Sequence, residues 1–349
     1  MSNAFQCKLG LICRQQMGTN FREKPQTAPP SPWVWRQLGH RYYNLGLYLD
    51  RTFGGKTWKV SVDAGFHCPN ADGTISQSGC LFCNIASFSP SRQRSGLSIR
   101  QQITQSTVRL RERRGIERVI AYFQPATNTY GSVEYLEHCY REAMSVPGVV
   151  GLAIGTRPDC LSDAVLDLLV NLGREIWLSV EIGAQSSHNR TLRQLNRGHS
   201  WEDSERAIRR CADRGIRTTA HLMFGLPGES LGEMLETVER IAELPIHGVK
   251  LHNLYVAKDT ELASLYENGH YQPLSQEEYV SIIVDALEQI PPNVVIERLT
   301  AETSDDYLIA PDWCRRKSET IELIHKQLVT RDTYQGRRFE EEPPPGVGD

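Results

Sequence analysis

Three cysteines in this sequence are spaced as ligands of a metal centre. Cys68, Cys80 and Cys83 lie in the string CPNADGTISQSGCLFC, with eleven residues between the first two and two between the last two. A structural zinc site closes with four protein ligands, whereas a 4Fe-4S cube held by three thiolates leaves one iron free to bind a small molecule. The spacing therefore predicts a reactive iron-sulfur cluster.

The alternative for these cysteines is a zinc site. His67 or a more distant residue would then supply the fourth ligand, although no matching Cys/His pair lies nearby in the sequence. The glycines and polar residues between Cys68 and Cys80 predict a loop, which suits a cluster held at the rim of a fold.

The elements that must position this loop alternate along the chain. Amphipathic helical stretches separate most of the apolar, β-branched segments, which are WKVSVDA, RVIAYFQ, GVVGLAIGT, IWLSVEIG, RTTAHLMFG, GVKLHNLYV and NVVIERL. Strands that alternate with helices indicate parallel βα units. We therefore expect an α/β fold, a partial (open) parallel β/α barrel of about six to seven βα units with a short C-terminal extension.

The ends of the chain differ from its middle. Residues 1–35 include PQTAPPSP and are expected to form a disordered or proline-rich leader, and residues 339–349 a disordered tail. The barrel is expected over residues 40–300 and the C-terminal extension over 301–338.

Composition narrows the class of protein. The 349 residues carry a net charge of −3, which gives no global sign of a nucleic-acid binder. No apolar run of about 18 residues is present, so we expect no membrane span. Nine cysteines, an odd number, without a secretory leader predict reduced thiols and a cytoplasmic location.

Polar residues recur just past the predicted strands. They are Gln124, Thr127, Asn128, Thr156, Arg157, Asp159, Glu181, Gln185, Glu229, His252, Asn253 and Lys258. Barrel enzymes build their sites from the loops at the carboxyl ends of strands, so this recurrence predicts an active site there. Ordinary solvated loop chemistry is the alternative for any one of these residues.

The cysteine string resembles the cluster motif of radical S-adenosylmethionine (SAM) enzymes. The strings YFQPATNTYG, AIGTRPDCLSD, EIGAQSSHNRTLRQLNRGH, HLMFGLPGE, VKLHNLYVAK and IAPDWC are similar to a bacterial subgroup of that superfamily whose members are uncharacterised. GTRPD, NRGH and GLPGE also resemble the radical SAM domain of the elongator complex's catalytic subunit, which acts on wobble uridine in tRNA. The resemblance covers roughly residues 40–338.

This resemblance implies a 4Fe-4S cluster and SAM as cofactors. An electron from a reductant such as flavodoxin or ferredoxin would pass through the cluster to cleave SAM and give a 5'-deoxyadenosyl radical that abstracts hydrogen from the substrate. The expected cofactor-binding residues are Phe82, Gln124, Thr127, Asn128, Thr156, Glu181, Gln185, Gly225, Leu226 and Pro227, and the expected catalytic residues are Arg157 and Glu181.

Each of these roles has an alternative. Arg157 suits a substrate carboxylate or phosphate, but it could instead form a salt bridge with Asp159 or Glu181. Phe82 is expected near the adenine, or in ordinary loop packing. The glycine of Gly225–Pro227 permits close approach of the backbone to the adenine, or simply forms a strand-to-helix turn.

Basic residues suggest what the substrate is. Residues 92–118 hold eight arginines and only two acids, the electrostatic footprint of a polyanion such as tRNA, or else a solvated helix face. Trp313 and Tyr334 in the basic C-terminal part would stack on bases or belong to the core. We expect modification of a wobble uridine side chain in tRNA; the alternatives are a small metabolite, as in porphyrin synthesis, and a non-catalytic metal-cluster module that binds RNA.

Overall fold

Seven parallel strands form an open half-barrel in the computed structural model, which describes residues 33–89 and 96–339. Their order is β1-β2-β3-β4-β5-β6-β8, and β7 pairs with β9 in a separate antiparallel ribbon. The strands are β1 (Thr57–Val62), β2 (Arg118–Phe123), β3 (Val149–Thr156), β4 (Trp177–Gln185), β5 (Arg217–Phe224), β6 (Gly248–Asn253), β7 (Val256–Ala257), β8 (Val295–Arg298) and β9 (Leu308–Ala310). The prediction of a partial parallel β/α barrel is confirmed.

Helices fill most of the connections between strands. They are α1 (Val34–Gln37), α2 (Leu45–Phe53), α3 (Ile85–Phe88), α4 (Ile99–Arg114), α5 (Val133–Met144), α6 (Asp163–Gly173), α7 (Asn189–Gln194), α8 (Trp201–Asp213), α9 (Leu231–Ala242), α10 (Glu261–Glu267), α11 (Gln276–Gln289) and α12 (Lys317–Thr330), with short 3-10 turns η2 (Pro158–Cys160), η3 (Asp312–Arg315) and η4 (Arg337–Phe339). Four begin with a capping box, in which a serine and an acid or amide three residues later satisfy free backbone N–H groups: Ser98, Ser200, Ser230 and Ser275.

The two faces of the sheet differ because side chains alternate along each strand. Outward residues such as Val60, Phe123 and Ile154 join the large core beneath the helices. Inward residues such as Lys59 and Glu181 line the concave side of the half-barrel, which we call the lumen. The outer face therefore supplies apolar burial, while the inner face is free to carry polar groups.

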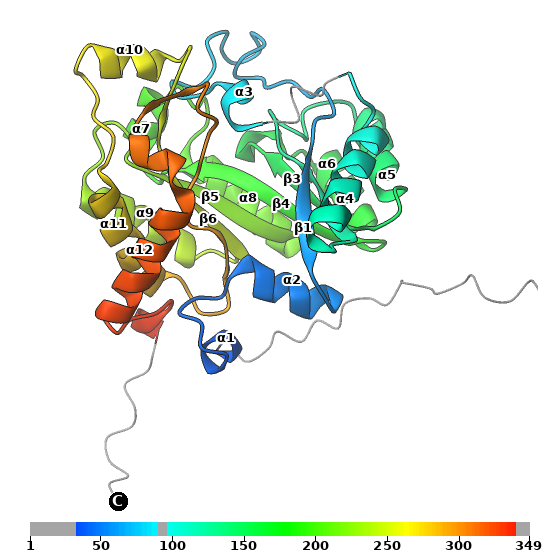
Figure 1. Cartoon of the computed structure of the whole chain (residues 1–349). Coiled ribbons are helices and arrows are strands. Elements are labelled where there is room, and N and C mark those ends of the chain that lie inside the picture. Colours follow the sequence, from blue (N-terminus) through cyan, green and yellow to red (C-terminus); the bar gives the residue numbers. More distant parts are fainter. Residues whose placement is uncertain (1–32, 90–95, 340–349) are drawn as a thin grey trace, which may run out of the picture.

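The amino-terminal end of the lumen is covered by α2. Leu49 of this helix is 2% exposed and packs with Ile120 and Ala153. Figure 1 shows α2 beneath the strands, at the end where β1 begins. This packing closes the amino end of the lumen.

The edge strands β1 and β8 are not neighbours in the sheet. Across the seam between them, Lys59 Nζ of β1 and Glu297 Oε2 of β8 form an ion pair of 2.5 Å. The half-barrel is thus joined at its seam by side chains.

The described ends of the chain pack on each other. Trp35, at the end of the predicted leader, is 1% exposed and donates from its indole to the carbonyl of Pro292, while Gln335 donates its backbone N–H to Arg41. The structure does not describe residues 1–32 of the predicted leader. It describes only residue 339 of the predicted tail. Within the described part, no helix has the length and apolar character needed to cross a membrane.

Candidate active site

The three cysteines lie in one loop at the carboxyl end of β1. We call residues 68–83 the cysteine loop, and Figure 1 shows it at the top of the molecule, at the opposite end from α2. Cys80 is buried, Cys68 half-buried and Cys83 exposed. The backbone N–H of Cys83 donates to the carbonyl of Cys80 at 2.9 Å, so a tight turn holds the Cys-x2-Cys pair.

Two donors point at the sulfur of Cys80. Asn70 Nδ2 lies 3.3 Å and Arg197 Nη1 3.2 Å from Sγ. Arg197 also donates from Nη2 to the carbonyl of Gly183 at 3.0 Å, which ties the cysteine loop to β4. Hydrogen bonds to cysteine sulfur help set the reduction potential of iron-sulfur clusters. This donor set suits a thiolate at Cys80.

A second segment, residues 195–199, packs against the cysteine loop and forms hydrogen bonds with it. The backbone N–H of Leu81 donates to the carbonyl of Leu195 at 3.1 Å, and Asn196 Nδ2 donates to the carbonyl of Gly79 at 2.6 Å. Asn196 adopts a left-handed φ of 52° to make this contact. We call residues 195–199 the support segment.

Gly198 in the support segment has no room for a side chain. Its φ is +68°, and a Cβ placed there would lie 2.7 Å from Cγ2 of Ile75 and 2.9 Å from Oδ1 of Asn70. Both the backbone conformation and the close approach therefore require glycine.

The thiols of Cys68 and Cys80 are close enough to Cys83 to raise the pKa of its thiol. Although part of the Cys83 residue is exposed, its thiol is surrounded by protein. This loss of solvation raises the pKa of Cys83 to about 12, and the thiols of Cys80 and Cys68 add to the rise. Among residues 33–89 and 96–339, no three His, Cys, Asp or Glu side chains converge closely enough to hold a single metal ion. In a 4Fe-4S cube each cysteine binds a different iron, so its ligands need not converge on one atom. The cysteines fit that ligand set.

Two residues in the loop after β2 have side-chain oxygens without a hydrogen-bond partner among the described residues. Thr127 Oγ1 and Asn128 Oδ1 are buried and have no partner among the described residues. Asn128 is held in place because its Nδ2 donates to the carbonyl of Gly155 at 2.9 Å. Buried polar atoms are normally paired. These oxygens therefore fit a ligand with donor groups, such as the amino group and ribose hydroxyls of SAM.

Arg157 and Thr156 are partly committed within the protein. Arg157 donates from Nε and Nη2 to Asp159 at 3.0 and 2.9 Å, which is the salt-bridge alternative raised by the sequence. Its Nη1 is buried without a partner in the described part of the chain. Thr156 Oγ1 shares a hydrogen bond of 2.5 Å with Thr129 Oγ1. Arg157 thus keeps one free donor, while Thr156 is already engaged.

The two glutamines predicted at the site behave differently. Gln124, directly after β2, donates from Nε2 to the carbonyl of Phe88 at 3.2 Å. Gln185, the last residue of β4, has a left-handed φ of 67°. Such strain in a residue other than glycine marks functional positions more often than structural ones.

An apolar group lies beside the cysteine loop. Phe82 packs against a cluster that includes Leu81, Leu195 and Leu226, so the structure brings Phe82 together with the turn after β5. In that turn Pro227 is buried, and Gly225 has a φ of +84°. This surface is suited to an adenine ring.

Glu181 lies deeper, inside the lumen, and both of its carboxylate oxygens are engaged. Lys59 Nζ lies 2.7 Å from Oε1, while His221 Nε2, at 3.0 Å, and Lys250 Nζ contact Oε2. Lys250 also donates to the hydroxyl of Tyr122 at 3.2 Å. We call the following residues the lumen cluster: Lys59, Tyr122, Glu181, His221, Lys250 and Glu297.

Charge pairing keeps the Glu181 carboxylate of the lumen cluster ionised despite burial. Burial opposes the charge of Glu181, but Lys250 and Lys59 outweigh it and hold its pKa well below the usual range. Burial lowers the pKa of Lys250 to about 8, against the attraction of Glu181. Burial and the charge of Lys250 lower the pKa of His221 to about 4, so its imidazole is neutral at pH 7.

The string NRGH, residues 196–199, is part of the resemblance described above, but sequence alone assigns no role to the support segment or to most of the lumen cluster. The strings SVEIG, TAHL and KLH alternate polar and apolar residues, and this period of two is the signal that the inner face of the sheet is polar. No comparable local signal reveals Arg197, because it is 117 positions from Cys80.

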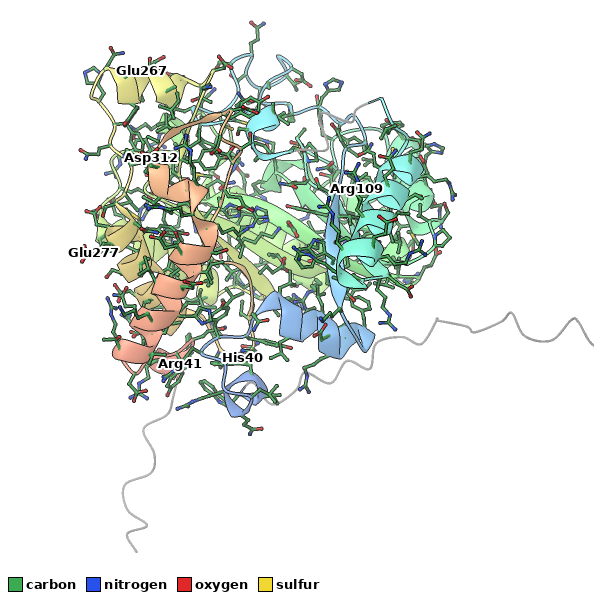
Figure 2. The ribbon with its side chains drawn as sticks, viewed as in Figure 1. His40, Arg41, Arg109, Glu267, Glu277 and Asp312 are labelled. Carbon is green, nitrogen blue, oxygen red and sulfur yellow. The ribbon has the colours of Figure 1, made fainter. Side chains whose placement is uncertain are left out.

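The arginines of α4 lie far from the cysteine loop. Arg109, Arg111, Arg113 and Arg114 are all exposed, and Figure 2 shows Arg109 on the flank of the molecule. The guanidinium of Arg114 lies 4.6 Å from the ring centre of Trp58, the second residue of β1. The end of α4 is therefore at the amino end of the sheet. Arg92 and Arg94 lie outside the described residues.

The predicted base-stacking aromatics belong to the core. Trp313 is 6% exposed and stacks on Tyr279 at 5.2 Å, and Tyr334 is 3% exposed and packs edge-on to Trp33. Their rings are buried against protein, so the core alternative is correct for both.

Comparison with known proteins assigns the chain to a family. The model of the radical SAM superfamily matches residues 74–241, and that of the radical SAM C-terminal domain matches residues 246–330. Uncharacterized protein YtqA of Bacillus subtilis is 36% identical over 310 residues, which cover 89% of this chain and 96% of the relative. Protein YhcC of Escherichia coli is 39% identical over 276 residues, covering 78% and 87%.

More distant matches carry a name that states a reaction. The tRNA uridine(34) acetyltransferase of Methanocaldococcus infernus is 30% identical over 182 residues, which cover 51% of this chain and 33% of that protein. The solved structure of Elp3 from the same organism has a TM-score of 0.59 and 21% identity, and covers 80% of this chain and 64% of that one.

Proposed function

The chain belongs to the radical SAM superfamily, and from that premise we propose that this radical SAM enzyme modifies the side chain of a wobble uridine in tRNA. Family membership implies a 4Fe-4S cluster and SAM, which together supply a 5'-deoxyadenosyl radical for hydrogen abstraction. Cys68, Cys80 and Cys83 would hold the cluster, and Arg197 and Asn70 would orient Cys80.

The observation that carries the proposal is the position of the polar lumen. The cysteine loop lies at the carboxyl ends of the strands, the end of the lumen that α2 does not cover. A single base would enter the lumen from that end while the rest of an RNA stays outside. The similarity over about half of this chain to proteins named tRNA uridine(34) acetyltransferase supports wobble uridine as that base.

Each predicted site residue has a proposed task. Thr127 and Asn128 would accept hydrogen bonds from SAM, and the surface formed by Phe82 and Gly225–Pro227 would cover its adenine. Gln124, Thr156 and Gln185 would shape the rim, and the free donor of Arg157 would bind an acidic group. Glu181 would organise the lumen cluster, because both of its oxygens are occupied.

A second candidate substrate is a small metabolite. The α4 arginines are distant from the cysteine loop, and a small molecule bound near the cluster would not need them. Mass spectrometry of tRNA nucleosides from a deletion strain and its parent separates the two. Loss of a modified uridine at position 34, restored by the wild-type gene, supports the tRNA proposal. Identical nucleosides in both strains contradict it.

A further inference from the structure

The lumen holds more cationic than anionic side chains. Lys59, Lys250 and Arg298 are set against Glu181 and Glu297. Arg298 is the last residue of β8 and pairs with Lys250 of β6 just after an irregularity in the register of the two strands. Its charge acts on His252, His221 and Lys250, so its guanidinium lies beside these lumen residues. Two like charges side by side are unfavourable without a counter-charge.

Arg298 has no counter-charge in the described part of the protein. No ion pair or hydrogen bond joins its guanidinium to residues 33–89 or 96–339, whereas Lys59 and Lys250 both contact Glu181. The side chain is half-buried rather than solvated at the surface. A cation held inside a protein in this way costs free energy unless an anion pairs with it.

His252 adds an unused polar atom to the same region. Its Nε2 is buried without a hydrogen-bond partner in the part of the chain that the structure describes. The ring stacks on His221 with centroids 5.4 Å apart. Burial, followed by the charge of Arg298, keeps the pKa of His252 well below its usual range, so the imidazole is neutral and able to donate one hydrogen bond.

We propose that the lumen binds an anionic group of the substrate, a carboxylate or a phosphate, with Arg298 as its principal partner and His252 as a neutral donor. The planar fork of arginine matches the two oxygens of either group. This inference deepens the proposed function, on which it rests, by assigning charge to the part of the substrate that enters the lumen. The excess of buried positive charge and the unpaired guanidinium are its basis.

The test measures anion binding to the full chain directly. Thermal melting is followed over a series of acetate or inorganic phosphate concentrations, with chloride keeping the ionic strength constant and acetamide as the neutral counterpart of acetate. Binding to the native state raises the melting temperature in a saturable way. We expect acetate or phosphate, and not acetamide, to do so, and the stronger of the two identifies the anionic group.

Variants locate the site. Arg298→Gln should weaken anion binding about tenfold or more, because a hydrogen-bonded charge is lost, and Arg298→Lys should weaken it less. The control is Arg174→Gln, which removes an exposed arginine elsewhere and should bind as wild type does. If Arg298→Gln fails to fold, His252→Gln and Arg298→Lys carry the test. Unchanged affinity in the Arg298 variants, or no saturable binding by wild type, overturns the inference.

A second readout separates this inference from the proposed function. Arg298→Gln should still cleave SAM in the absence of substrate, because Arg298 is no part of the cysteine loop, but should lose modification of the substrate. Unchanged tRNA in the deletion strain would refute the tRNA proposal even if acetate or phosphate binding depends on Arg298.

Discussion

The two ends of the sheet differ in how well their buried groups are packed and paired. At the amino end, Tyr48 and Phe53 of α2 pack against Trp177, and the Trp177 indole donates to the Tyr48 hydroxyl at 3.0 Å. At the carboxyl end lie five of the seven buried polar atoms that lack a partner among the described residues. They belong to Asn70, Thr127, Asn128, Arg157 and His252.

Backbone strain follows the same division. Four of the five described residues other than glycine with positive φ lie at the carboxyl end of the sheet: Ala126, Gln185, Asn196 and Asp259. Strain and unpaired polar atoms cost free energy and persist where the surroundings enforce them. The comparison indicates that the amino end contributes stability. At the carboxyl end, strained backbone and unpaired polar atoms reduce stability, and these groups remain available to bind a ligand.

The largest effect is expected from the cysteines. Replacing Cys68, Cys80 or Cys83 with alanine should abolish both the cluster and SAM cleavage, because each thiolate holds one iron. Iron analysis and detection of 5'-deoxyadenosine measure the two losses. Cys160→Ala is the matched control, since this half-buried cysteine lies outside the cysteine loop. About four irons per chain and normal cleavage in any of the three variants would contradict the assignment.

The second effect tests the lumen cluster. Glu181→Gln removes the partner of Lys59 and Lys250 and should destabilise the protein by about 3 to 5 kcal/mol, because buried cations are left unpaired. Urea denaturation gives the change in the free energy of unfolding. The control is Glu137→Gln, which breaks an exposed ion pair with Arg141 and should cost far less, because solvent screens exposed pairs. Similar losses in both variants would show that the lumen is well hydrated.

The third effect sharpens the contrast between the ends. Leu49→Ala removes a buried side chain of α2 and should cost about 2 to 5 kcal/mol of stability. SAM cleavage below the melting temperature should stay near the wild-type rate, because the cysteine loop is at the other end of the sheet. A loss of cleavage in the folded variant would mean that the ends are coupled.

A subtler effect is expected at Arg197. Arg197→Gln should lower the midpoint potential of the cluster, because a positive charge and a hydrogen bond to Cys80 are lost. Substitutions of this kind usually reduce metal affinity or activity by about 10- to 100-fold. A redox titration followed by electron paramagnetic resonance measures the potential, and Arg197→Lys should restore part of it. An unchanged potential would leave Arg197 with a purely structural role.

The smallest effect concerns the α4 arginines. Changing Arg109, Arg111, Arg113 and Arg114 to glutamine should flatten the salt dependence of tRNA binding by about one unit of slope per lost phosphate contact. About two units are expected, because a helix presents one face to a partner. Filter binding over a salt series measures the slope, and SAM cleavage should not change. An unchanged slope would place the RNA at the carboxyl end alone.

The sequence predicts the repeating part of this architecture well. All seven apolar segments are strands of the sheet, because runs such as RVIAYFQ and GVVGLAIGT reflect burial that local pattern records. The cysteine spacing likewise leads directly to the loop after β1. Contacts between distant segments could not be predicted in this way. The hydrogen bond from Arg197 to Cys80, and the lack of an ion-pair partner for Arg298 among the described residues, depend on register and packing that no local pattern records.

The support segment has a consequence for the order of events during synthesis. Residues 68–83 leave the ribosome more than a hundred residues before Gly198, which alone fits against them, and before Arg197, which holds Cys80. The cysteine loop therefore cannot take its final shape until β4 and α7 have been made. If iron and sulfide were delivered to the nascent chain before that point, they would meet thiols without their hydrogen bonds. Maturation of the cluster therefore belongs after the synthesis of Gly198.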